Sequence, residues 1–401
     1  MLEIKPIFNS LRRSKAGAMM LLIQIAITVA IVSNAAFIIY DRINYLQQET
    51  GYPEQDVFSF SVLTFGTDID KVQQIQKDED MLRNVPGVIN AVHMSEIPLS
   101  GSGSASSFAL DADPTDSKTA RSAYAFGDEN MISTLGVKIL EGRDFTQEDV
   151  VIQTTPDEIP TVTVVSKGFA DDLFPEGDAL GSIFHFGPYP IKIIGIIEKM
   201  KGPWLKDRAA DNMILFPLVT EQTFQKMIVR TEPGQRAAVM RQVEELMLAN
   251  YDQRVITSPQ GMDDAKQEYN ASDILMMRML IVLISVLVMV TALGIFGLTV
   301  FNINKRTKQI GTRRALGARK SAIVRYFLVE NSLICVFGLA LGSIAAIYLG
   351  QALLTHYSLP ALDNTYVVVT AVCVLCVSLL SVLVPANRAA NISPSVATRS
   401  V

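Results

Sequence analysis

The sequence has few residues of the kinds that build catalytic or metal sites. Its 401 residues include only three histidines, His93, His185 and His356, which lie far apart without the spacing of metal ligands. It contains no G-x-x-x-x-G-K-[ST] loop for binding nucleotide phosphates and no zinc-protease or hydrolase motif. We therefore expect no catalytic site, no metal and no cofactor held by this chain.

Cysteine is also scarce, and none of it lies between residues 41 and 273. Cys335, Cys373 and Cys376 all fall within apolar stretches. A disulfide framework therefore cannot form in the 41–273 region. The Cys373-x-x-Cys376 pair has no histidine or acidic neighbour, so we interpret it as packing against lipid or helix rather than as a redox or metal site.

Long uncharged runs are the strongest positive signal. Four stretches are long enough to cross about 30 Å of hydrocarbon as helices, and only Arg278, near the start of the second, interrupts them. They predict an α-helical membrane protein with four transmembrane helices and a large α+β periplasmic domain inserted between helices 1 and 2. The predicted segments are a cytoplasmic amphipathic lead-in (1–15), transmembrane helix 1 (16–40), the periplasmic domain with a helical stalk (41–273), transmembrane helix 2 (274–303), a cytoplasmic coupling segment (304–327), transmembrane helix 3 (328–354), a short periplasmic loop (355–365), transmembrane helix 4 (366–386) and a cytoplasmic tail (387–401).

Charge is distributed unevenly and predicts the orientation. Residues 41–273 hold 37 of the 40 acidic residues but only 20 of the 35 basic ones. Basic residues instead gather before the first span, between the second and third, and after the fourth, which marks those sides as cytoplasmic. We expect a multi-pass membrane protein with both termini in the cytoplasm. The acidic outer region argues against nucleic acid as a partner.

The 41–273 region mixes strand and helix patterns, typical of a two-lobed α+β domain. Strands are expected at Val57–Leu63, Thr161–Val165 and Ile191–Ile197, and helices at Phe169–Phe174 and Arg236–Tyr251. The serine- and glycine-rich stretch from Leu99 to Ser107 is predicted to be a flexible loop.

Three features concern the spans themselves. The absence of glycine and proline between Asp263 and Gly294 predicts one continuous helix from about Ala265 to Ile303, about 58 Å long, that carries displacement out of the bilayer. In the first span, Gln24 and Thr28 share one helical face, which we expect to meet another helix. The spans lack acidic or basic groups at mid-depth, which argues against an ion-coupled carrier.

The segment between the second and third spans alternates basic residues with small and apolar ones. Gly311 and Gly317 permit a turn or close backbone approach, and Ile310 and Leu316 could enter a groove on a partner. The alternative is a plain basic loop against anionic lipid. Eight residues of this segment are of interest for such a contact: Lys308, Gln309, Ile310, Gly311, Arg314, Ala315, Leu316 and Gly317.

These residues carry a family resemblance. The run Arg306 to Ala318, followed by Phe327 to Glu330, resembles permease subunits of the MacB/FtsX type of ABC transporter. The end of the chain from Pro385 to Ala390, and the outer stretches Glu141 to Phe145 and Val164 to Gly181, are similar to the same family. The resemblance covers nearly the whole chain in the same order.

The resemblance implies a permease dimer bound to cytoplasmic ABC ATPase subunits that bind the ATP, with the eight contact residues forming the coupling surface. Since the chain starts within fifteen residues of its first span, we expect the ATPase to be a separate polypeptide. The family usually has Glu where this chain has Gln309, which favours a heterodimer with a related permease. We expect Glu330 to pair with an arginine near the inner end of the third span.

The resemblance implies a protein of the bacterial inner membrane that drives export or efflux from the periplasm or outer leaflet, with a periplasmic adaptor and an outer-membrane duct as further partners. Two alternatives stay open: a regulatory complex that controls a cell-wall hydrolase or senses peptides, and release of lipoproteins from the membrane. The sequence leaves the substrate undetermined.

Overall fold

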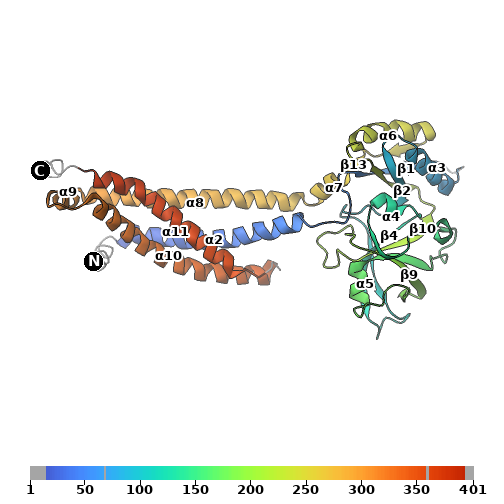
Figure 1. The fold of residues 1–401 in the computed structure, drawn as a ribbon, viewed down its shortest axis with the longest axis horizontal. Coiled ribbons are helices and arrows are strands. Elements are labelled where there is room, and N and C mark those ends of the chain that lie inside the picture. Colours follow the sequence, from blue (N-terminus) through green and yellow to red (C-terminus); the bar gives the residue numbers. More distant parts are fainter. Residues whose placement is uncertain (1–14, 67–68, 358–360, 393–401) are drawn as a thin grey trace. The chain divides into compact units, whose positions relative to one another are not determined.

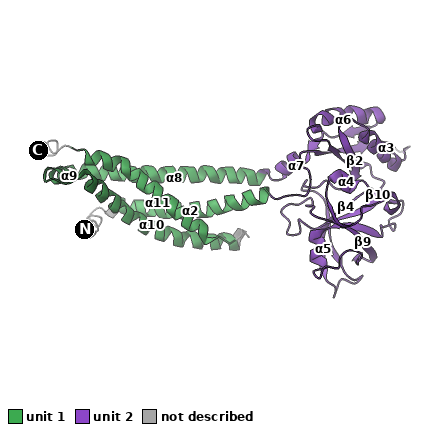
Figure 2. Ribbon diagram, viewed as in Figure 1, with its two compact units in different colours: residues 1–47, 272–401 green, residues 48–271 purple. Residues whose placement is uncertain are grey.

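The computed structural model describes residues 15–66, 69–357 and 361–392. The predicted lead-in at residues 1–15 lies outside this range except for Lys15, as does the tail from residue 393 onward. The chain divides into two compact units, residues 1–47 with 272–401 and residues 48–271 (Figure 2).

The first unit is a helical bundle (Figure 1). Within the described residues, four helices are long and apolar enough to cross a membrane, as expected. They are α2 (Lys15–Leu46), α8 (Ala271–Lys305), α10 (Lys320–Tyr357) and α11 (Asn364–Ala390), with the short helix α9 (Thr307–Ala315) between α8 and α10. The helices run several residues beyond the predicted spans, because the polar ends continue the helical hydrogen bonding outside the apolar run.

Small residues let α10 approach α2 closely. Gly338, Gly342, Ala346 and Gly350 recur every four residues and are all buried. A Cβ added at Gly342 would lie 2.8 Å from the Ala26 carbonyl oxygen. This spacing of small residues is the usual basis of close helix packing in membranes, and α2 is the most enclosed of the four helices.

Polar side chains join α2 to α8, as expected for the polar face of the first span. The hydroxyls of Thr28 and Thr291 lie 2.8 Å apart in a buried hydrogen bond. Gln24 lies against Gly294, where an added Cβ would come within 2.7 Å of the amide oxygen. Toward the other end of the pair, Arg42 forms an ion pair with Asp273 at 3.7 Å.

The prediction of one continuous helix from Ala265 to Ile303 is wrong. The structure has α7 (Met262–Tyr269) and α8, separated at Asn270. Both the backbone N–H and the side-chain amide of Asn270 donate to the Lys266 carbonyl, at 3.1 and 2.8 Å. A short polar side chain that competes for its own helix's carbonyl favours a helix end, so a break forms here without glycine or proline.

The second unit is built on a mixed sheet of thirteen strands within the described residues. The strand order is β12-β1-β11-β2-β4-β3-β8-β9-β7-β10-β6, with β13 beside β1 and β5 beside β9. The strands are β1 (Val57–Thr64), β2 (Val88–Met94), β3 (Ser104–Ala109), β4 (Thr119–Gly127), β5 (Ile139–Gly142), β6 (Val151–Gln153), β7 (Val162–Ser166), β8 (Ile183–Phe186), β9 (Tyr189–Ile197), β10 (Met213–Thr220), β11 (Phe224–Thr231), β12 (Arg254–Ile256) and β13 (Gln260–Gly261). The helical elements are α3 (Lys71–Arg83), α4 (Met131–Leu135), the 3-10 turn η1 (Gln147–Asp149), α5 (Lys167–Leu173) and α6 (Arg236–Asn250).

Two separate cores give this unit its two lobes. One core packs α3 and α6 on β1 and β11 around Phe58 and Leu82. The other packs α5 on β7, β9 and β10 around Phe108 and Phe169. The predicted α+β class and two lobes are confirmed, and each predicted strand and helix falls on an observed element, within two residues at its ends.

The prediction of a flexible loop at residues 99–107 is wrong. Its second half is the start of β3, and its first half is fixed by neighbours. The Trp204 indole donates to the Gly101 carbonyl at 2.9 Å, and the Gly101 N–H donates to the Pro203 carbonyl at 2.9 Å. Gly101 has φ 75° and lies under the ring of Tyr269, where a Cβ would collide. Glycine here serves close packing rather than mobility.

The Glu141–Phe145 stretch, which carried part of the resemblance, has a structural role. Arg143 makes a two-point pair with Asp149 at 2.6 and 2.9 Å, and these hydrogen bonds hold the pKa of Asp149 well below its usual range. Gly142 has φ 81°, and an added Cβ would meet the Ile194 carbonyl oxygen at 2.2 Å. The motif therefore fixes a tight turn against β9.

Ion pairs attach α7 to the body of the second unit. Lys266 bonds Glu54 at 2.8 Å, and Arg236 bonds Asp263 at 2.6 Å. Arg236 also donates to the Glu54 backbone carbonyl at 3.0 Å. These side chains join α7, α6 and the chain entering β1, so the two segments that lead to α2 and α8 are held together within this unit.

Candidate coupling site

The basic segment between α8 and α10 folds as a short helix between two turns. Arg306 leaves helical geometry, with φ −111° and ψ 13°, and α9 starts at the next residue. At the other end Gly317 has φ 91°, a conformation that glycine adopts without strain. Its N–H donates to the Arg314 carbonyl, and the next N–H donates to the Arg313 carbonyl. The predicted segment is therefore ordered, with α9 at its centre.

Arg306 and Glu330 fix the start of α9 to α10. Two guanidinium nitrogens of Arg306 each lie 3.0 Å from a carboxylate oxygen of Glu330. Arg306 also donates to the Tyr326 hydroxyl at 3.1 Å. The expected pairing of Glu330 with an arginine is confirmed. Two-point arginine–carboxylate pairs are directional, so α9 has a defined position on α10.

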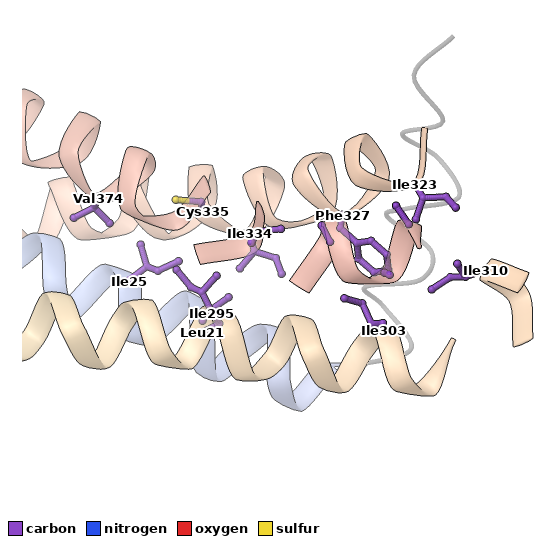
Figure 3. Packing of buried hydrophobic residues seen from close by; sticks show 14 of the residues in the cluster. Leu21, Ile25, Ile295, Ile303, Ile310, Ile323, Phe327, Ile334, Cys335 and Val374 are labelled. Atoms are coloured by element: carbon purple, nitrogen blue, oxygen red, sulfur yellow. The ribbon is translucent and has the colours of Figure 1, made fainter. Parts of the chain in front are cut away.

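The inner face of α9 is apolar. Ile310 is 6% exposed and packs with Ile303, Ile323 and Phe327 at the end of the bundle's core (Figure 3). Gly311 beside it is also buried. These two predicted contact residues face their own chain, so any effect they have on a partner passes through the position of α9.

The outer face of α9 is exposed and cationic. Leu316 is 83% exposed, the largest exposure among the large hydrophobic residues that the structure describes as exposed. The other exposed members of the predicted set are Lys308, Gln309, Ala315 and Gly317. Arg314 is half-buried, with its guanidinium donating to the Ala318 carbonyl at 2.9 Å. An apolar side chain on a basic surface is suited to docking rather than to bond-making chemistry.

Three residues of this site, Arg306, Arg313 and Tyr326, are not among the predicted contact residues. Arg313 places its guanidinium over the Tyr326 ring, 5.4 Å from the centroid. A small cavity of about 40 Å³ lies among these three residues, Gln309, Ile310, Ile323 and Phe327. Arg313 and Tyr326 are thirteen positions apart in the sequence with a turn between them, so no helical spacing reveals the contact.

Comparison with known proteins covers both units. The family of the MacB-like periplasmic core domain matches residues 17–246, and the FtsX-like permease C-terminal family matches residues 281–394. The matched relatives include the macrolide export ATP-binding/permease protein MacB of Chromobacterium violaceum, 24% identical over 65% of this chain and 40% of the relative. The MacB protein of Pectobacterium atrosepticum is 26% identical over 66% and 42%, respectively. The pyoverdine export ATP-binding/permease protein PvdT of Pseudomonas aeruginosa is 27% identical over 65% and 40%.

The chain thus spans about 40% of the length of these relatives. Among solved structures, the periplasmic region of MacB from Actinobacillus actinomycetemcomitans is similar with a TM-score of 0.33 and 14% identity, covering 56% of this chain and 97% of that one. The extracellular domain of the transporter YknZ gives 0.32 and 15%, covering 50% and 99%.

Proposed function

Since this chain belongs to the family of ABC transporter permeases with a MacB-like periplasmic core domain and an FtsX-like C-terminal region, we propose that it couples ATP hydrolysis by a separate cytoplasmic ATPase to movement of its periplasmic domain. That movement drives export of a substrate from the periplasm or the outer leaflet. These 401 residues contain no phosphate-binding loop, so in this proposal the ATP is bound outside them. The permease itself makes and breaks no covalent bonds.

The orientation follows from the basic residues. With both termini in the cytoplasm, α9 faces the cytoplasm and residues 48–271 lie in the periplasm. Eight basic residues lie between Lys305 and Arg325, against no acidic one. The cytoplasmic side therefore carries the docking surface for the ATPase.

The observation that carries the proposal is that Leu316 is exposed at the end of α9, while the start of α9 is bonded to α10. Leu316 projects from the turn after α9, and the Arg306–Glu330 pair ties the start of the same helix to α10. A helix fixed in this way can enter a partner's groove and pass a displacement to α8 and α10. An apolar anchor beside charged residues is the usual form of a helix-in-groove contact.

The assembly contains a second permease. Most apolar side chains of α8 between Leu275 and Val290 are exposed in the single chain, which leaves this helix available to lipid or to another copy. Because Gln309 stands where the family usually has Glu, the second permease in this proposal is a related chain that carries the Glu. A periplasmic adaptor and an outer-membrane duct complete the proposed export path, and export is preferred over regulation or lipoprotein release because the relatives are named as export proteins.

Leu316→Asp tests the coupling site. A charge buried at a helix-in-groove contact costs up to several kcal/mol of desolvation. We therefore expect ATPase recruitment and ATPase stimulation to fall by about tenfold or more, which corresponds to about 1.4 kcal/mol, while membrane insertion is unchanged. Leu180→Asp, the same change at an exposed leucine of the second unit, is the matched control. Wild-type recruitment and stimulation by Leu316→Asp would remove α9 from the coupling role.

A further inference from the structure

We propose that the cavity between α9 and α10, lined by Arg306, Arg313 and Tyr326, binds the phosphate group of an anionic phospholipid. The site lies on the inner side of α9, whereas Leu316 projects from the turn beyond its end. The inference does not rest on the proposed ATPase contact, because a lipid site exists or fails to exist whether or not an ATPase docks nearby.

The depth of the cavity suits a lipid headgroup. It adjoins the last turn of α8, where Ile303 is the final buried apolar residue, and the first turns of α10, where Ile323 and Phe327 begin the core. The ends of two spanning helices mark the boundary between hydrocarbon and headgroups. Tyrosine is enriched at this level because its ring is apolar and its hydroxyl is polar.

The charges of the cavity are unequal. Glu330 balances the charge of Arg306 and is itself 5% exposed. Arg313 has no acidic partner within the part of the chain that the structure describes, and its guanidinium lies over the Tyr326 ring. A cation–π contact of this kind leaves the N–H groups able to donate. Arginine in this arrangement is well suited to binding phosphate oxygens.

The volume and the surroundings agree with this ligand. A cavity of about 40 Å³ has room for about three water-sized groups, comparable to the oxygens of one phosphate. Basic pockets between spanning helices at the cytoplasmic surface are a recurrent form of anionic lipid site. The apolar neighbours Ile323 and Phe327 would lie beside the glycerol and the first methylenes.

Binding would set the position of α9. A phosphate held by Arg313 and the Tyr326 hydroxyl would bridge the end of α9 to α10, adding to the Arg306–Glu330 pair at its start. The lipid composition of the membrane would thereby tune how firmly the coupling helix is held.

The test measures lipid retention by native mass spectrometry on the purified full chain, without ATPase, with phosphatidylglycerol and phosphatidylcholine as probes. We expect preferential retention of phosphatidylglycerol, and a loss of about fivefold or more in Arg313→Gln. Arg319→Gln removes the same charge from an exposed residue outside the cavity and should stay within about twofold of wild type. Tyr326→Phe, which keeps the ring but removes the hydroxyl, should give an intermediate loss.

Three outcomes would overturn the inference. Equal losses in Arg313→Gln and Arg319→Gln would indicate a diffuse basic surface. Equal retention of the two lipids would exclude recognition of the anionic headgroup. Displacement of phosphatidylglycerol by inorganic phosphate alone would assign the cavity to a free anion. A thermal unfolding curve of Arg313→Gln that matches wild type shows that a loss of lipid reflects the site rather than misfolding.

Discussion

Arg306 and Glu330 form a two-point ion pair whose two N–O distances are both 3.0 Å, and the side chains are only 15% and 5% exposed. The pair joins the junction of α8 and α9 to the third turn of α10. Breaking a buried pair by removing one partner costs more than the pair contributes, because the remaining charge has no counter-ion. The position of α9 on α10 should therefore be sensitive to a single change in this pair.

Glu330→Gln should lower the free energy of unfolding by about 3 kcal/mol, because it leaves the Arg306 guanidinium largely enclosed and uncompensated. Thermal unfolding in detergent, followed by circular dichroism, measures the loss. The double variant Arg306→Gln with Glu330→Gln should be less destabilised than the two single changes added together, because both charges are then gone. Strict additivity would show that the two residues act independently.

The close approach of α2 and α10 gives a second prediction. In Gly342→Leu the new side chain would meet Ala26 and Val29, and overpacking of this kind costs about 1–3 kcal/mol. Gly297→Leu on α8 is the matched control, since nothing lies within 4 Å of its added Cβ, and leucine favours a helix more than glycine. We expect the thermal unfolding midpoint to fall only in Gly342→Leu. Similar midpoints in the two variants would mean that the packing of α2 on α10 adds little to stability.

Whether α7 relays movement to the second unit can be tested apart from the proposed coupling site. Lys266→Gln combined with Asp263→Asn removes the ion pairs to Glu54 and Arg236 that hold α7 to the second unit. If α7 transmits movement, transport should fall several-fold while ATPase recruitment stays at the wild-type level. Lys138→Gln, which breaks the exposed pair with Glu198 in the same unit, serves as control. Unchanged transport in the double variant would place the relay elsewhere, for example on the segment that follows α2.

The sequence predicted what depends on local pattern and missed what depends on particular side-chain contacts. Uncharged runs located the four spans, and alternation located β1, β7 and β9, because burial imposes those patterns directly. The helix break at Asn270 was missed because it depends on hydrogen bonds that an asparagine can make to its own helix. Order at Gly101 was missed because Trp204 and Tyr269, which fix it, lie more than a hundred residues away.

The candidate site shows the same division. Residue types predicted a contact segment where α9 lies, but the inward and outward faces of α9 depend on where the helix starts, which the Arg306–Glu330 pair fixes. Ile310 and Leu316 were equivalent in the sequence, whereas one is buried and the other is 83% exposed. The pairing of Arg313 with Tyr326 requires the Gly317 turn to bring α9 back onto α10.

His93 predicts an acid-sensitive second unit. Burial lowers the pKa of His93 to about 4, with Asp128 opposing and Lys226 reinforcing the shift, and neither ring nitrogen has a hydrogen-bond partner among the described residues. The unfolded chain takes up this proton below about pH 6.5, the ordinary value of the pKa. The folded unit does so only near pH 4, so its stability is fully present above that window and falls through it as the pH is lowered.

His93→Leu should remove this dependence, because leucine fills the buried position without a proton site. The contribution of His93 to the free energy of unfolding should fall by about 3 kcal/mol between roughly pH 7 and pH 4, measured as the difference between the wild-type and His93→Leu curves. Fluorescence of Trp204, the only tryptophan and a residue of the same unit, follows unfolding of the full chain in detergent. Burial, with a smaller effect from Asp128, raises the pKa of Glu79 well above its usual value. The contribution of Glu79 to the free energy of unfolding therefore has the opposite pH dependence and falls as the pH rises. Wild-type and His93→Leu curves with the same slope between pH 7 and pH 4 would mean that the buried imidazole does not govern acid unfolding.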